Sequence, residues 1–256
     1  MSPILRLART EILEHRRQGS MLAILVANYM LWIGVFGGIF LSFDRAMADP
    51  ATAQALRVQA QSLGIALDTV LAMGVSTFGS FVFTNLPLFV ATLSGYSVLH
   101  DRTCGTLPFL LLAPVTRRQL LVGKLLGAMA LPLVFHLVFV AMSSLALAGL
   151  PTLAPYGAEL GGSVAWWVAY LLGAPASAVL VGAIGTLISA LSRDVRTSMQ
   201  WTSFFIGLLS LLFGYAMVDG LAWGVPLQLA FAATCVTLGG GVLLVGERVV
   251  SREIES

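Results

Sequence analysis

The chain contains 256 residues, of which 58% are hydrophobic and only 10% are charged. Soluble domains carry about 25% charged residues, so this composition, with a mean hydropathy of +0.92, excludes an ordinary soluble domain and predicts an all-α polytopic membrane protein. The formal charge is only +2, and we expect no nucleic-acid partner. The two cysteines, Cys104 and Cys235, predict neither a disulfide framework nor a metal site.

The N-terminal segment, residues 1–20, alternates apolar and basic side chains at helical spacing. Ile4, Leu5, Ala8, Ile12 and Leu13 recur on one side, between arginines and a glutamate. This pattern is typical of an amphipathic helix that lies in the membrane interface. A charged anchor that only fixes the topology is the alternative interpretation.

Six segments are apolar and long enough to cross a bilayer, which takes roughly 20 helical residues. The predicted transmembrane helices are residues 21–43, 69–99, 120–150, 163–191, 199–218 and 225–245. Pro87, Pro132 and Pro175 lie inside these spans, where neighbouring helices can satisfy the freed carbonyl groups.

Small residues within the first and fourth spans predict close helix packing. The first span contains Gly34, Gly37 and Gly38, and the fourth contains Gly182 and Gly185. Glycines at such spacing let two helix backbones approach each other in a membrane.

The basic residues are unevenly distributed between the segments that join the spans. The N-terminal segment, the loops after the second and fourth spans and the tail hold 12 of the 14 Lys and Arg residues, and the other side holds Arg45 and Arg57. Positively charged loops stay in the cytoplasm, so both termini are predicted to be cytoplasmic, in agreement with six spans. We therefore expect a multi-pass protein of the cell (inner) membrane that forms a single domain over residues 1–256.

The longest predicted extracytoplasmic connection is residues 44–68. Its Asp49-Pro50 pair is a helix-start signal, and good helix formers follow. We expect a short extracytoplasmic helix that leads into the second span. The other outer loops, around residues 151–162 and 219–224, are brief.

No constellation of residues in the chain indicates an active site. His136 lies inside the third span, where ionisable residues are candidates for proton pathways, but no acidic residue lies in the predicted core of any span. A neutral His136 bonded to a backbone or hydroxyl group is therefore favoured. Ser143 and Ser144 lack the base and oxyanion site of a nucleophile. We predict no catalytic residues and no enzymatic activity for the chain by itself.

Gly123-Lys124 is a Gly-Lys dipeptide, which also occurs near the end of the phosphate-binding loop motif. That loop needs another glycine five positions before Gly123 and a Ser or Thr after the lysine, where Arg118 and Leu125 stand. The chain is therefore predicted to bind no cofactor, so that ATP and Mg²⁺ would be bound by a separate subunit.

The fifth predicted span differs from the others because polar residues run through it. It mixes Trp201, Thr202, Ser203, Ser210 and Tyr215 with Phe and Leu. A stripe of this kind faces either a partner helix or a translocation path, and both interpretations stay open.

Residues 101–118 interrupt the apolar pattern between the second and third spans. Gly105 permits a sharp turn, Thr106 is the predicted N-cap of a new helix, and Pro108 suits its first turn. The run Phe109 to Leu112 supplies an apolar surface before Pro114. We expect a short helix at the cytoplasmic surface, roughly parallel to the membrane; a plain re-entry loop is the alternative.

The order of motifs around this segment resembles the ABC-2 family of ABC-transporter permeases. The matching motifs are Asp101-Arg102, Gly105-Thr106-Leu107, Ala113-Pro114-Val115-Thr116-Arg117 and Gly123-Lys124. Thr103 and Pro108 depart from the pattern, since many members have Glu at these positions. The six-span layout and the amphipathic N-terminal helix also resemble this family.

The resemblance implies that residues 101–118 form a coupling helix that docks on an ATPase. The implied ATPase-coupling residues are Asp101, Arg102, Gly105, Thr106, Leu107, Phe109, Leu110 and Leu111. In such permeases the second and fifth spans line the dimer seam. The implied translocation-path residues are therefore Phe83, Thr84, Asn85, Trp201, Ser203 and Phe204.

The resemblance also implies the partners and the function. Two ABC ATPase subunits and a second permease copy or a homologue would complete the assembly within the lipid bilayer. The leading hypothesis is an exporter of an amphipathic or lipid-linked substrate. The alternative is mechanical transmission of the ATPase cycle to an extracytoplasmic or maturation partner, as in nitrous-oxide-reductase or cytochrome c maturation systems.

Overall fold

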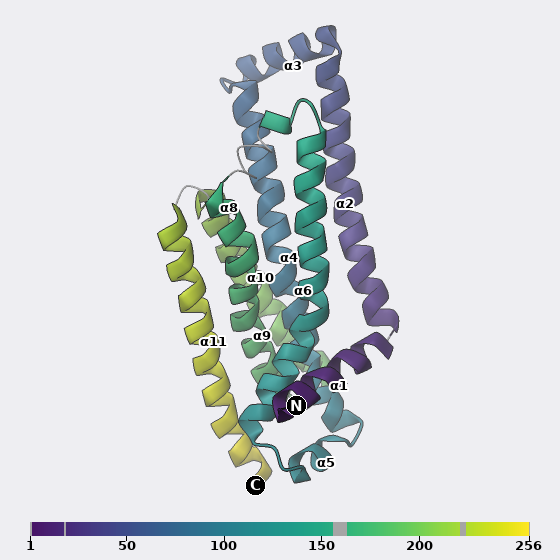
Figure 1. Ribbon diagram of the computed structural model, residues 1–256, viewed down its shortest axis with the longest axis vertical. Coiled ribbons are helices and arrows are strands. Elements are labelled where there is room, and N and C mark those ends of the chain that lie inside the picture. The colour runs from purple at the N-terminus through teal and green to yellow at the C-terminus, as the bar shows by residue number, and fades with distance from the viewer. Residues whose placement is uncertain (1, 18, 156–162, 221–223, 256) are drawn as a thin grey trace.

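Every regular element in the described part of the chain is a helix (Figure 1). The computed structural model describes residues 2–17, 19–155, 163–220 and 224–255; within these ranges the side chains of residues 16, 17, 20–22, 111, 210–220 and 249–255 are not described. The helices are α1 (Pro3–Arg17), α2 (Gly19–Ala48), α3 (Pro50–Ser62), α4 (Leu67–Thr103), α5 (Leu107–Leu112), α6 (Arg117–Gly149), α8 (Val164–Val168), the π-helical turn η1 (Ala169–Gly173), α9 (Ala174–Leu191), α10 (Val195–Gly220) and α11 (Gly224–Glu255).

Five helical segments are long and apolar enough to cross a membrane. They are Ala23–Ala48, Leu67–Thr103, Arg117–Gly149, Val164–Leu191 and Gly224–Arg248. These segments correspond to five of the six predicted spans, with ends that differ by a few residues, and confirm a multi-pass membrane protein. The fifth predicted span lies within α10, whose side chains beyond residue 209 are outside the description, so the described residues support a count of five.

The bundle is organised around α4, which packs along α9 and also contacts α6 and α10. Figure 1 shows α2 and α11 at the flanks of the bundle, α3 across one end, and α1 and α5 at the other. We call the end with α1 and α5 the basal end and the end with α3 the apical end. Both α1 and the C-terminal part of α11 lie at the basal end (Figure 1).

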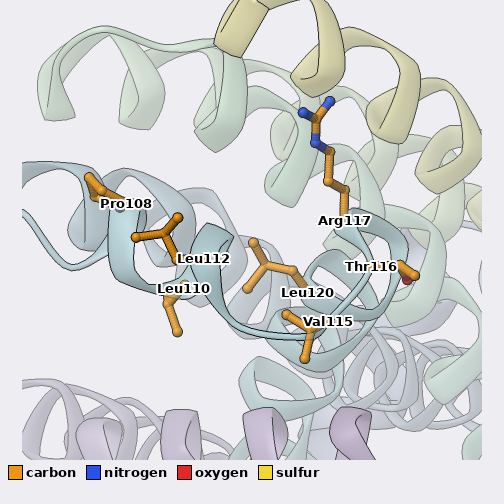
Figure 2. Close-up of a pocket in the computed structure, with 7 residues that line it drawn as sticks. All are labelled: Pro108, Leu110, Leu112, Val115, Thr116, Arg117 and Leu120. Atoms are coloured by element: carbon orange, nitrogen blue, oxygen red, sulfur yellow. The ribbon is translucent and has the colours of Figure 1, made fainter.

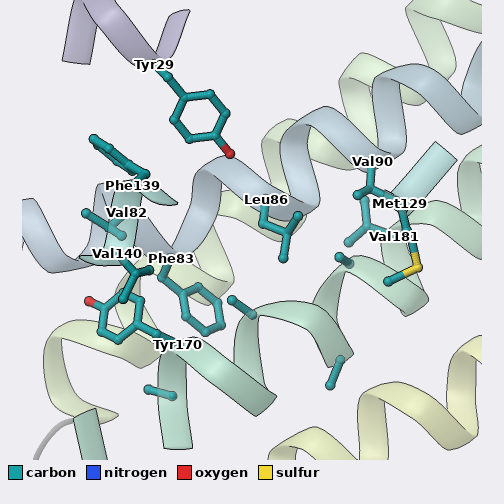
Figure 3. Packing of buried hydrophobic residues seen from close by; sticks show 14 of the residues in the cluster. Tyr29, Val82, Phe83, Leu86, Val90, Met129, Phe139, Val140, Tyr170 and Val181 are labelled. Carbon is teal, nitrogen blue, oxygen red and sulfur yellow. The ribbon is translucent and has the colours of Figure 1, made fainter. Parts of the chain in front are cut away.

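The buried core runs along one side of α4. Val82, Phe83, Leu86 and Val90 follow one another at helical spacing, and Figure 3 shows them among residues of α6, η1 and α9, including Tyr170 of η1. In a bilayer, apolar burial does not by itself favour helix association, because lipid tails are as apolar as these side chains. Tight packing of the kind seen along α4 is therefore the main attraction.

Glycine creates the closest approach between α4 and α9. A Cβ at Gly185 would lie 2.9 Å from the backbone oxygen of Ala91, and one at Gly182 would lie 2.7 Å from Val90 Cγ1. The predicted packing role is thus confirmed for this pair. It is wrong for Gly34, Gly37 and Gly38 within this chain, because each faces open space.

His136 satisfies a backbone carbonyl that the helix geometry leaves without a donor. In the π-helical turn the N–H of Ala174 donates to Ala169, and the matching donor for Tyr170 would come from residue 175, a proline. His136 Nε2 lies 3.1 Å from the Tyr170 oxygen and donates in its place. The prediction of a backbone-bonded His136 is confirmed.

The apical end carries the predicted extracytoplasmic helix as α3. Asp49 caps it by accepting a hydrogen bond from Thr52 N at 3.1 Å, and Pro50 occupies the first turn. The Asp-Pro helix start is confirmed. A turn at residues 63–66, with Gly64 at φ +71°, separates α3 from α4, so the two helices are distinct.

We expect Gly185→Leu to destabilise the bundle by about 1–3 kcal/mol, because the new side chain must displace α4 backbone that has no room to move. Gly240→Leu is the matched control, since nothing lies within 4 Å of a Cβ at that position of α11. Thermal unfolding of both purified variants in detergent measures the difference. Equal midpoints would contradict this account of the α4–α9 contact.

Candidate functional site

The turn between α4 and α5 reverses the chain within a few residues. Gly105 has φ +71°, a conformation that residues with a side chain rarely adopt. The backbone N–H of Thr106 donates to the Asp101 carbonyl at 2.9 Å, and the Thr106 hydroxyl donates to a carboxylate oxygen of Asp101 at 3.3 Å. α5 is thereby fixed to the last turn of α4.

The predicted short helix is present, but its predicted cap is wrong. Thr106 has a helical backbone and makes no capping hydrogen bond to α5, because its hydroxyl is engaged by Asp101. The threonine that caps a helix in this region is Thr116, which accepts from Gln119 N at 3.2 Å while its own N–H donates to the Gln119 side chain at 2.9 Å. This reciprocal pair begins α6.

The outer face of α5 is strongly apolar and exposed. Phe109 is 73% exposed and Leu112 is 83% exposed, whereas Leu107 packs inward against Val98 and Leu121. The side chain of Leu111 is not described. Beside α5 lies a hollow of about 550 Å³, shown in Figure 2 and lined by Pro108, Leu110, Leu112, Val115, Thr116, Arg117 and Leu120. An exposed apolar knob beside a hollow is typical of a protein contact surface.

A buried charge cluster lies behind this surface and joins three helices. Lys124 Nζ of α6 lies 2.5 Å from Glu11 Oε2 of α1 and 2.7 Å from Asp101 Oδ2 of α4. The three side chains are only 4–5% exposed. We call Glu11, Asp101, Lys124 and the adjacent His15 the basal charge cluster. A charge buried this far from water is tolerated only beside its partner, so the cluster holds α1, α4 and α6 together.

Two glycines of α6 let α1 come close enough to make these ion pairs. A Cβ at Gly123 would lie 2.7 Å from Leu7 Cβ, and one at Gly127 would lie 2.7 Å from Glu11 Cγ. The glycines are four residues apart and therefore share one face of α6. The sequence Gly-Lys-Leu-Leu-Gly at 123–127 thus provides a groove for α1 and a cation beside it.

Burial sets the protonation of the α1 side chains in the cluster. It raises the pKa of Glu11 from 4.5 to about 7, although Lys124 opposes the shift. Burial also lowers the pKa of His15 from 6.5 to about 4, and the charge of Lys124 adds to that effect. His15 Nε2 lies 3.5 Å from Glu11 Oε1. Near neutral pH, His15 is neutral and Glu11 is partly protonated.

Arg102 ties the same turn of α4 to another helix. Its guanidinium donates to the carbonyls of Ser192 at 2.9 Å and Ala190 at 3.0 Å, at the C-terminal end of α9. These carbonyls lack helical donors, and a cation there also stabilises the helix dipole. Asp101 and Arg102 therefore connect the turn between α4 and α5 to neighbouring helices within the chain.

The six predicted translocation-path residues separate into three groups. Thr84, Asn85 and Ser203 line one groove between α2, α4 and α10. Phe83 lies in the core, with its ring against Tyr170 and Phe231 at centroid distances of 6.3 and 6.4 Å. Trp201 and Phe204 are 54% and 62% exposed on α10, outside that groove.

No functional role was predicted from the sequence for Glu11, His15 or Lys124. A signal was available, because Ala8, Glu11 and His15 recur at helical spacing and share the buried face of α1. Lys124 is also the only lysine in the chain, and it stands in an apolar stretch. Within the described ranges, no group of His, Cys, Asp and Glu is arranged to hold a metal ion.

Comparison with known proteins agrees with this architecture. The profile of a family described as ABC-2 family transporter protein matches residues 5–228. The match covers most of the chain, from α1 into α11, and includes the basal charge cluster. Comparison with curated proteins gives no match.

We expect Lys124→Met to release α1 from the bundle, because two buried carboxylates then lose their cation at a cost of about 3–5 kcal/mol. Hydrogen exchange of residues 3–17 in the purified protein measures the release as faster exchange. The triple variant Glu11→Gln, Asp101→Asn, Lys124→Met removes every charge together and should exchange much more slowly than the single variant. If the single and triple variants exchange equally fast, the cluster does not hold α1.

The pH dependence of α1 docking follows from the two shifted groups. Because the pKa of Glu11 is raised, this group stabilises docked α1 fully below pH 4.5. The stabilisation is lost as the pH rises to about 7. Because the pKa of His15 is lowered, this group stabilises docked α1 fully above pH 6.5. The stabilisation is lost as the pH falls to about 4. The two effects oppose each other, so we expect docking in the wild-type protein to change little between pH 4.5 and 6.5.

Removing either group should expose the effect of the other. In His15→Gln, α1 docking is expected to weaken as pH rises from 4.5 to 7; in Glu11→Gln, it is expected to weaken as pH falls from 6.5 to 4. Hydrogen exchange of α1, corrected for the intrinsic pH dependence of exchange, gives the measurement. Parallel pH profiles for the two variants would be inconsistent with opposing protonation.

Proposed function

The chain belongs to the ABC-2 family of transporter membrane proteins, and we propose that it is the transmembrane subunit of an ATP-driven exporter for an amphipathic or lipid-linked substrate. Two separate ABC ATPase subunits would bind and hydrolyse ATP with Mg²⁺. A second permease copy or a homologue would complete the pathway across the cell (inner) membrane. The observation that carries this proposal is the exposed apolar surface of α5, anchored to buried charges directly behind it.

The proposed topology has six spans with the basal end in the cytoplasm. It is supported by the placement of α1, α5 and the C-terminal part of α11 at one end of the bundle (Figure 1). It is also supported by the 12 of 14 basic residues that the sequence concentrates in the segments assigned to this side. In this orientation an ATPase subunit meets Phe109 and Leu112 from the cytoplasm.

The contacts within the coupling segment indicate how a force on α5 would spread. α5 follows Asp101 through the hydrogen bonds of Thr106. Asp101 is paired with Lys124, which also holds Glu11, and Arg102 holds the end of α9. In the proposed cycle, a push by the ATPase therefore moves α1 and the basal ends of α4, α6 and α9 together.

A second candidate function is mechanical transmission to an extracytoplasmic partner. The observation that favours it is the apical end, where α3 and the following turn expose Val58, Leu63 and Ile65. In that function the ATPase cycle would change the position of α3, and no bulky substrate would cross. ATP-dependent substrate movement in reconstituted vesicles separates the two functions.

The docking surface can be tested by placing a charge on it. Phe109→Asp combined with Leu112→Asp is expected to abolish co-purification with the co-expressed ABC ATPase, because burying unpaired carboxylates in an apolar interface is unfavourable. Leu63→Asp is the control, since Leu63 is a strongly exposed leucine at the apical end. If the double variant retains the ATPase, or the control loses it, α5 is not the docking surface.

A further inference from the structure

The chain contains only two asparagines, and the fold brings them together inside the membrane-spanning region. Asn28 of α2 donates through Nδ2 to Asn85 Oδ1 of α4 at 2.9 Å. Trp32 Nε1 donates to Asn28 Oδ1 at 3.2 Å, and Asn85 Nδ2 donates to the Phe81 carbonyl at 2.7 Å. Two amides and an indole N–H thus form one hydrogen-bonded group between α2 and α4.

These amides retain hydrogen-bonding capacity. Each side-chain NH₂ has two N–H groups, and the bonds above use one from each. Asn85 lies midway between the ends of α4, where unsatisfied polar groups cost several kcal/mol in hydrocarbon. Polar side chains at such depth are therefore either bonded between helices or part of a functional site.

Asn85 lines a groove of about 330 Å³ between α2, α4 and α10, and Asn28 bonds Asn85 without lining the groove itself. Trp32 and Phe81 form an aromatic wall, with ring centroids 4.8 Å apart. Thr84, Thr92 and Ser203 add hydroxyl groups, and none of the described residues that line the groove is charged. We call this the amide groove. A groove of this size with aromatic walls and a few polar groups is typical of small-molecule binding sites.

We propose that the amide groove binds the uncharged, hydroxyl-rich headgroup of an amphipathic molecule that enters from the bilayer. The Asn85 amide, positioned by Asn28, and the hydroxyls of the groove donate and accept hydrogen bonds, as hydroxyl groups require. The aromatic wall packs against the apolar face of such a headgroup. A charged headgroup finds no counter-ion among the lining residues and would be buried at high cost. This assignment rests on the proposed transport function and specifies its substrate class.

A simple interhelical hydrogen bond is the competing explanation for the asparagine pair. Such bonds contribute only about 0.6 kcal/mol on average between membrane helices. That explanation accounts for Asn28 and Asn85 but leaves the aromatic wall and the hydroxyls of the same groove without a role. The two explanations differ in whether the groove retains a lipid.

The experiment uses the purified chain, without an ATPase, in phosphatidylcholine nanodiscs. The discs carry equal amounts of monoglucosyl diacylglycerol and phosphatidylglycerol with identical acyl chains, and native mass spectrometry counts the lipids retained. We expect preferential retention of the glucolipid. Asn28→Leu and Asn85→Leu should each weaken retention roughly fivefold, the effect of one net hydrogen bond. Equal retention of the two lipids, or unchanged retention in both variants, overturns the assignment.

Matched variants separate binding from folding. Thr77→Val is the control, because Thr77 is exposed on α4 outside the groove and its hydroxyl bonds only the Met73 carbonyl. It should retain the glucolipid as the wild-type protein does. Trp32→Phe preserves the aromatic wall and removes the indole N–H, so retention should fall in a protein with unchanged thermal stability. Unchanged retention in Trp32→Phe contradicts a role for this polar group.

A photoreactive side chain at position 203 distinguishes a lipid site from a protein interface. Cross-linking to the glucolipid supports the assignment, whereas cross-linking to a second copy of the chain with none to the glucolipid overturns it. Since no ATPase is present, failure of the α5 docking test leaves this measurement unaffected. Asn85→Leu is in turn expected to leave ATPase co-purification unchanged, so the two proposals can fail independently.

Discussion

A single buried lysine holds the basal end of this protein together. Lys124 is the only lysine in the chain, and its ammonium group lies between carboxylates from two other helices, Glu11 and Asp101. A charge in such an apolar setting is stable only when its partners are in contact, so α1, α4 and α6 must meet at this point. The same need for contact between α1 and α6 explains the two glycines of α6. Glu11 reaches Lys124 only because Gly123 and Gly127 present no side chain beneath α1.

α4 carries this constraint into the rest of the bundle. Asp101 and Arg102 are adjacent and therefore point about 100° apart around the helix. The first side chain reaches α6, and the second reaches the carbonyls at the end of α9. One turn of α4 thus fixes the positions of α1, α6 and α9 relative to α5. An acidic residue followed by a basic one is suited to this place because the neighbouring groups have opposite charge: an ammonium on one side and a helix C-terminus on the other.

The features that the sequence could predict are those set by neighbouring residues. Asp49-Pro50 begins α3, and Gly105 with Pro108 marks the start of α5, because turns and first helical turns depend on local backbone preferences. The Glu11–Lys124 pair spans 113 residues and depends on how whole helices pack, which no local pattern encodes. The sequence also could not predict which side of α4 faces the core. Phe83 lies in the core and its neighbour Thr84 in the groove, on a helix that is apolar nearly all round.

α4 is also the element that the basal charge cluster and the amide groove share. Asp101 lies near its basal end and Asn85 at its middle, and Pro87 stands between them. Pro87 has no N–H, so the carbonyl of Phe83 lacks its helical donor and the helix bends more easily there than elsewhere. In the proposed transport cycle, a force applied at the basal end would bend α4 next to Asn85, where α4 bonds α2. Coupling between the two proposed sites would then need no chain of rearranged core contacts, because one helix with a defined weak point connects them.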